Sequence, residues 1–171
     1  MAEKSGDQDP AEPTLKRLEE EGEVAADYLE ELLDIADLDG DIDIDVDHGR
    51  AAVAIVSEEA GDRWLRRLVG EHGEVLDALQ ELTRLAVQAR TGERSRLMLD
   101  VAGYRDRRRA ELTRVGEEAV ARVRAGGTSV ALEPMNPFER KVVHDVVAQA
   151  GLVSDSAGAE PHRHVVVHPA Q

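Results

Sequence analysis

The sequence contains no cysteine and only four aromatic residues, which are Tyr28, Trp64, Tyr104 and Phe138. The lack of cysteine excludes disulfides, thiolate zinc sites and cysteine nucleophiles. So few aromatic side chains argue against a sheet that stacks nucleic-acid bases on several rings. No apolar run approaches about 18 residues and the N-terminal segment is acidic, so neither a membrane span nor a secretory signal is predicted. We therefore expect a cytoplasmic protein whose 171 residues form one domain or two small ones.

Charge is distributed unevenly along the chain. The formal net charge of −15 comes mainly from residues 1–50, which hold 18 acidic and 4 basic residues. Residues 84–124 are instead basic, with 11 arginines against 6 acidic residues. Apolar residues make up 42% of the sequence, which is enough for a folded core. The sequence therefore predicts an acidic head joined to a body with a basic stripe, and arginine is suited to bidentate contacts with phosphate.

Hydrophobic periodicity predicts the elements of the first hundred residues. Residues 1–22 are polar and charged, and we expect a disordered acidic tail there. The next residues give, in order, a helix from Val24 to about Asp37, strands over 41–47 and 51–56, helices over 61–69 and from Gly73 onward, and a strand over 96–101. In the first strand, aspartate alternates with apolar residues, which predicts one buried face.

The last seventy residues begin with a long helix that carries much of the arginine. This helix is predicted from Tyr104 to Arg124 and ends at two glycines. Asn136, Pro137 and Glu139 form a strong helix start, because asparagine caps, proline suits the first position and glutamate completes a capping box. The remaining predicted elements are a strand over 128–132, the capped helix to about Ala150, and strands over 152–156 and 163–168.

A Gly-x-x-Gly loop, formed by Gly70, Glu71, His72 and Gly73, lies between two short helices that follow two strands. Glycines without side chains and free N–H groups at a helix start let a nucleic-acid backbone approach closely. In this element order, residues 24–101 resemble a type II KH domain, whose loop clamps four nucleotides. Glu71 departs from that family, because its carboxylate repels phosphate unless His72 is protonated. The alternative is a helix corner with glycine caps.

Arg140 and His144 lie one helical turn apart in the capped helix. Together with the run from Pro134 to His144 and the segment from Glu160 to Arg163, they resemble the single-stranded nucleic-acid-binding domain named after its Arg-x-x-x-His motif, the R-three-H domain. We expect the guanidinium and the imidazole to lie side by side, open to solvent, and to hold a phosphate. The expected RNA-binding residues are Gly70, Glu71, His72, Gly73, Arg105, Arg108, Arg109, Arg140, Lys141, His144 and Arg163.

A KH domain followed directly by an R-three-H domain resembles the bacterial Jag family over about residues 24–168. The predicted fold class is α+β, with a disordered tail (1–22), a type II KH-like domain (23–101) and a small R-three-H domain (102–171). The resemblance implies binding of single-stranded RNA, or of single-stranded DNA, pairing with a small stand-alone KH protein, and a regulatory role in envelope growth, division or sporulation. The resemblance is also compatible with a homodimer. The alternative function is an adaptor that pairs through its KH module while the KH loop does not contact RNA.

Other groups of polar residues carry less chemistry. The aspartates from Asp37 to Asp43 do not have the spacing of a calcium loop. His162, His164 and His168 share one face of a predicted strand, but without an identified carboxylate partner we expect a structural or phosphate-facing role and no metal site. No Ser-His-acid order or nucleophile elbow is found. The sequence therefore predicts no enzymatic activity and no cofactor.

Overall fold

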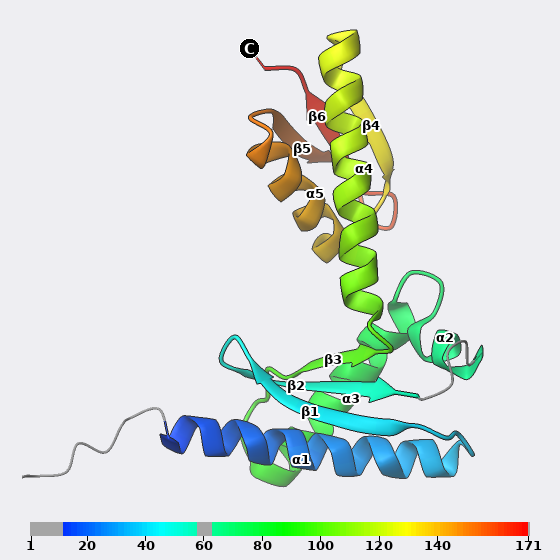
Figure 1. Ribbon diagram of the computed structural model, residues 1–171, viewed down its shortest axis with the longest axis vertical. Helices are drawn as coiled ribbons and strands as arrows, with labels where there is room; N and C mark the ends of the chain where they lie inside the picture. Colours follow the sequence, from blue (N-terminus) through cyan, green and yellow to red (C-terminus); the bar gives the residue numbers. More distant parts are fainter. Residues whose placement is uncertain (1–11, 58–62, 171) are drawn as a thin grey trace, which may run out of the picture. The chain divides into compact units, whose positions relative to one another are not determined.

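The computed structural model describes residues 12–57 and 63–170, and the chain divides after Tyr104 into two compact units. The first unit comprises the described residues up to Tyr104, and the second begins at Arg105. Both combine helices with a small sheet, as predicted (Figure 1). Within the described ranges, no helix is long and apolar enough to cross a membrane.

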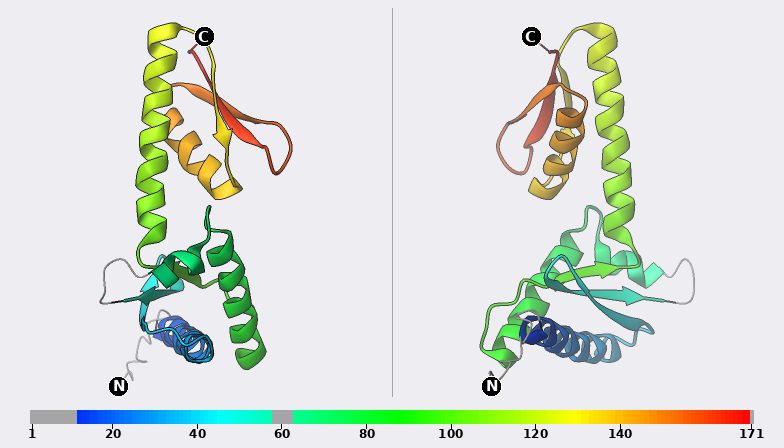
Figure 2. Two further views of the ribbon diagram at one scale, coloured as in Figure 1. Left: turned by 90° about the vertical axis from the view of Figure 1, so that its right-hand side faces the viewer. Right: turned by 60° about the vertical axis from the view of Figure 1, so that its left-hand side comes forward.

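The first unit has the predicted order of helix, strand, strand, helix, helix and strand. Its elements are α1 (Glu12–Ile35), β1 (Asp41–Asp47), β2 (Arg50–Val56), α2 (Arg63–Val69), α3 (Glu74–Thr91) and β3 (Met98–Val101). The strands form one sheet in the order β1-β2-β3, with β2 antiparallel to β1 and parallel to β3. Helices α1 and α3 lie side by side against this sheet (Figure 2). Alternate residues of β2, Ala51, Val53 and Ile55, are buried beneath them.

Helix α1 begins at Glu12, twelve residues before the predicted start at Val24. The prediction of a disordered tail is therefore wrong for residues 12–22, while residues 1–11 lie outside the described part. Leu18 is buried and extends the apolar stripe of the helix by two turns. A β-carbon at Gly22 would clash with Ile44 of β1, so the small residue allows the helix and the strand to approach. One buried face is sufficient for a helix, even when the other residues are charged.

Strand β1 has the predicted bounds but not the predicted burial. Ile42 and Val46 are half-buried, and Ile44 is 42% exposed. β1 is an edge strand, so it has a neighbouring strand on only one side. The four aspartates of the strand are all exposed, and such charges discourage pairing with another chain at a sheet edge.

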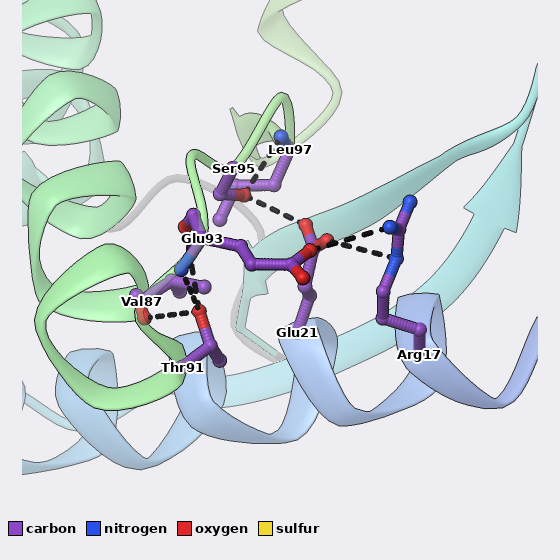
Figure 3. A network of polar contacts seen from close by, with 7 residues as sticks. All are labelled: Arg17, Glu21, Val87, Thr91, Glu93, Ser95 and Leu97. Atoms are coloured by element: carbon purple, nitrogen blue, oxygen red, sulfur yellow. Dashed lines mark hydrogen bonds and ion pairs between the residues drawn. The ribbon is translucent and has the colours of Figure 1, made fainter. Parts of the chain in front are cut away.

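The connection from α3 to β3 is fixed by polar contacts with α1 (Figure 3). The hydroxyl group of Ser95 donates to the buried carboxylate of Glu21 at 2.8 Å and accepts from the N–H of Leu97 at 3.2 Å. Arg17 reaches Glu93 at 3.3 Å. A buried carboxylate without a partner would be costly, so these contacts hold the connection against α1.

The second unit contains α4 (Tyr104–Gly126) from its second residue onward, β4 (Val130–Pro134), α5 (Pro137–Gln149), β5 (Val153–Ala157) and β6 (His164–His168). Its antiparallel sheet has the order β4-β6-β5. Leu112 of α4 joins Val143 of α5 and Val165 of β6 in one core. The predicted capping box is confirmed: the Asn136 side chain accepts from the N–H of Glu139 at 2.9 Å, and the Glu139 carboxylate accepts from the N–H of Asn136 at 3.1 Å.

Candidate nucleic-acid interface

The Gly-x-x-Gly loop is closed by a carboxylate that the sequence analysis did not consider. The backbone N–H of Glu71 donates to Glu74 Oε1 at 3.0 Å, and that of His72 donates to Oε2 at 2.7 Å. The hydrogen bond from His72 contributes most to a lowered pKa of Glu74, and the bond from Glu71 adds to the effect. The Glu74 carboxyl group therefore stays ionised at more acidic pH than usual. The expectation of free N–H groups is therefore wrong at these two positions. Glu74 already accepts from two N–H groups that would otherwise be available to a phosphate oxygen.

Gly70 and Gly73 both have left-handed backbone angles, with φ of +83° and +82°. A β-carbon at Gly73 would lie 3.0 Å from Tyr104 Cε1, and one at Gly70 would lie 2.6 Å from Glu74 Oε1. Glycine favours such angles because it has no β-carbon. The local backbone therefore favours glycine at both positions, whether or not the loop contacts a nucleic acid.

Arg140 is buried, contrary to the expectation that it faces solvent. Its Nη1 donates to the Met135 carbonyl oxygen at 2.5 Å, and its Nη2 lies 2.9 Å from Glu160 Oε1. Glu160 lies in the connection between β5 and β6, so the guanidinium links this connection to the segment before α5. The guanidinium is already paired with a carboxylate and a carbonyl group.

His144 faces β5 and two serines. Its Nδ1 lies 2.7 Å from Ser154 Oγ, and its Nε2 lies 2.9 Å from Ser156 Oγ. The half-buried ring lines a shallow hollow of about 560 Å³ together with Asp145 and Asp155. Two carboxylates beside the imidazole repel a phosphate. The structure therefore does not combine Arg140 and His144 into the expected phosphate clamp, and their contact with RNA stays a prediction.

Several other predicted RNA-binding residues hold acidic or backbone partners. Arg108 bonds Glu139 at 2.8 Å and Glu111 at 3.1 Å, which links α4 to α5. Lys141 pairs with Asp145 at 2.6 Å, but both side chains are well exposed, so solvent weakens the pair. Two further predicted residues are half-buried: Arg163, which lies 3.5 Å from the Gly158 carbonyl oxygen, and Arg105, which opens the second unit.

Arg109 is an exposed arginine whose aromatic partner the sequence analysis missed. Its guanidinium carbon lies 5.7 Å from the centre of the Phe138 ring, and Phe138 is 37% exposed. This distance is within the range of a cation–π contact. The two residues come from α4 and α5, and 29 positions separate them in the sequence. The sequence offered one sign of this contact, which was an aromatic residue, Phe138, in the first turn of a well-capped helix.

A hydrogen-bonded chain of Ser129, His168 and Asp155 was also missed. Ser129 Oγ lies 2.8 Å from His168 Nδ1, and Asp155 Oδ2 lies 2.9 Å from His168 Nε2. In serine hydrolases the serine contacts Nε2 and the acid contacts Nδ1, which is the reverse arrangement. The chain joins β5 and β6 to the residue before β4.

The aspartates and histidines that the sequence analysis considered as metal ligands are not gathered around one point. His164 Nδ1 lies 3.1 Å from the His162 carbonyl oxygen, whereas His168 is held by the chain just described. Among the residues that the structure describes, no three histidine or acidic side chains are placed to hold a metal ion.

Comparison with known proteins places this chain in a family. A model of the R-three-H domain matches residues 110–169. Proteins named RNA-binding protein KhpB are 33% identical in Clostridium symbiosum, over 92% of this chain and 70% of the relative, and 37% identical in Lactiplantibacillus plantarum, over 92% and 48%. The Bacillus subtilis protein of that name is 32% identical over 58% of this chain and 50% of its own length. The chain thus spans between about half and about two thirds of the relatives' lengths. It belongs to the KhpB, or Jag, family.

Proposed function

We propose that this protein binds single-stranded RNA and catalyses no reaction. The relatives are named RNA-binding proteins, and the second unit matches the R-three-H domain. The observation that carries the proposal is the exposed pair of Arg109 and Phe138, because nucleobases stack on aromatic rings and on guanidinium planes. A regulatory role in envelope growth, division or sporulation, and the cytoplasmic location, are further predictions from the family resemblance.

The Arg109–Phe138 pair can hold a base without reading its identity. Stacking on an aromatic side chain contributes about 1–3 kcal/mol per base and tolerates any sequence. Lys141 follows Phe138 by three residues and therefore lies on the same side of α5, where its exposed ammonium can contact the phosphate of the stacked nucleotide. Phosphate contacts position a strand and carry little sequence information, so we expect modest specificity.

The first prediction concerns this pair in the intact protein. Replacing Phe138 by leucine keeps an apolar side chain but removes the stacking ring, and we expect an affinity for a single-stranded oligonucleotide about tenfold lower. Arg109→Ala removes the guanidinium plane from the stack and is expected to weaken binding; because a positive charge beside the strand is also lost, the slope of log affinity against log salt is expected to fall by at most about 0.7. Fluorescence anisotropy of a labelled RNA, titrated at several salt concentrations, measures both effects.

Arg122→Ala is the matched control for Arg109→Ala. It removes the same charge from an exposed position of α4 outside the Arg109–Phe138 pair. The control is expected to change the affinity by less than either test variant. If Phe138→Leu and Arg109→Ala bind RNA as the unchanged protein does, this surface is not the interface. A parallel titration with duplex RNA tests whether binding needs an unpaired strand.

For the first unit, we infer a type II KH-like domain that serves as an adaptor. Its element order supports the assignment, and the observation that favours the adaptor role is Glu74, which occupies the N–H groups of Glu71 and His72. The partner implied by the family resemblance is a small stand-alone KH protein, with a homodimer as the other expectation. Light scattering of the mixed proteins detects the pairing. Slower exchange of the Glu71 and His72 amides when RNA is added would contradict the adaptor role.

A further inference from the structure

We propose that the first unit has a second phosphate-binding site, in a hollow lined by four arginines beside the C-terminal half of α3. The hollow has a volume of about 620 Å³ and is lined by Arg50, Arg84, Arg94 and Arg96. None of these residues belongs to the Gly-x-x-Gly loop or to the predicted RNA-binding set. The proposal deepens the proposed function, since it supplies another contact for an RNA strand, but it rests on residues of a different unit.

The four arginines come from three separate parts of the chain. Arg50 begins β2 directly after the hairpin, Arg84 lies on α3, and Arg94 and Arg96 lie in the connection from α3 to β3. Glu81 is the one acidic residue among the lining residues. Four guanidinium groups therefore face a single carboxylate, which leaves an excess of positive charge at this surface although the protein as a whole is acidic.

Arg84 is held in a fixed orientation by its neighbours. Its Nε donates to the Leu97 carbonyl oxygen at 2.9 Å, and its Nη1 donates to Glu81 Oε1 at 2.7 Å. Its Nη2 lies 3.9 Å from Met98 Sδ, and the side chain, which lines the hollow, is 25% exposed. The Glu81 carboxylate is therefore already paired with Arg84. Among the residues that the structure describes, Arg50, Arg94 and Arg96 have no acidic partner.

The connection that carries Arg94 and Arg96 is anchored on its other side. Ser95 and Leu97 are buried, whereas Arg94 and Arg96 are exposed, so alternate residues face opposite sides. Figure 3 shows Glu93, Ser95 and Leu97 in the network with Arg17 and Glu21 of α1. The backbone between these anchors is therefore fixed, and the two arginines are displayed toward the hollow without a large loss of backbone freedom on binding.

A phosphate group fits this arrangement. Guanidinium groups form short, paired hydrogen bonds with phosphate oxygens, and several guanidinium groups together balance the negative charge of one phosphate. Like charges that line one hollow repel one another, and a bound phosphate relieves that repulsion. The phosphate can come from an RNA strand or from a free nucleotide or pyrophosphate, because the recognised chemistry is the same.

The second prediction tests this site by NMR of the intact, isotope-labelled protein. We expect a single-stranded oligonucleotide, pyrophosphate, or both to shift the amide signals of Arg50, Arg94, Ser95 and Arg96 in a saturable way. The two titrations distinguish an RNA strand from a free phosphate as the source. In Arg94→Ala/Arg96→Ala these shifts should be lost, and the salt slope of any RNA binding should fall by about 0.7 for each lost phosphate contact.

Arg90→Ala/Arg122→Ala is the matched control, because it removes two exposed arginines that do not line the hollow. The control should retain the shifts. The shifts should also persist in Phe138→Leu, so a failure of the Arg109–Phe138 interface is distinguishable from a failure of this site. Absence of shifts with both ligands, or equal shifts in Arg94→Ala/Arg96→Ala, overturns the proposal.

Discussion

Replacing Arg140 by alanine is expected to lower the free energy of unfolding by about 2–3 kcal/mol, because it leaves buried polar groups without their partner. The guanidinium holds the Met135 carbonyl oxygen and the Glu160 carboxylate, and only 10% of its side chain is exposed. Glu160 is 56% exposed and can be hydrated when the arginine is lost, so the effect is smaller than for a fully buried pair. Urea denaturation followed by circular dichroism measures the change.

The next residue along the chain provides the control. Lys141 is also basic and paired with an acid, but its side chain is 74% exposed, so Lys141→Ala is expected to cost less than about 0.5 kcal/mol. If Arg140→Ala instead retains its stability and loses RNA binding, the arginine acts as the phosphate ligand that the sequence analysis expected. Its buried contacts then do not contribute to the stability of the fold.

The elements of this fold could be predicted because their signals are local. Aspartate alternating with apolar residues placed β1 at its observed bounds, and the cap at Asn136 gave the start of α5. Each signal depends on residues within one turn or one strand. The start of α1 was missed for the same reason. Leu18 is a buried apolar residue in a polar stretch, and only contact with the rest of the first unit shows that it belongs to a helix.

The contacts within the candidate sites could not be predicted, because they depend on which side chains from distant parts of the chain meet. The motif gave the spacing of Arg140 and His144, but not that Glu160, 20 positions later, pairs with the arginine. The contact between Arg109 and Phe138 likewise joins distant positions. Glu74 is different. It lies three residues after Glu71, so its hydrogen bonds to the loop are local and could have been considered.

Replacing Gly73 by alanine is the last prediction, and it separates the needs of the fold from those of nucleic-acid binding. An L-residue in the left-handed region costs about 1–2 kcal/mol. At Gly73 the new methyl group would also lie 3.0 Å from Tyr104 Cε1 and 3.1 Å from its hydroxyl oxygen. We therefore expect the free energy of unfolding to fall by about 2–3 kcal/mol, as the strain and the close contact act together.

Gly49→Ala is the matched control, because Gly49 has φ of +70° but no atom within 4 Å of the new methyl group. It is expected to show the backbone strain alone, at about 1 kcal/mol. Denaturation of both variants gives the difference due to Tyr104. If the two variants lose equal stability, Tyr104 yields to the methyl group and packing does not require glycine at position 73. If Gly73→Ala costs more, the second glycine of the motif is explained by packing, so its presence alone does not indicate that RNA reaches this loop.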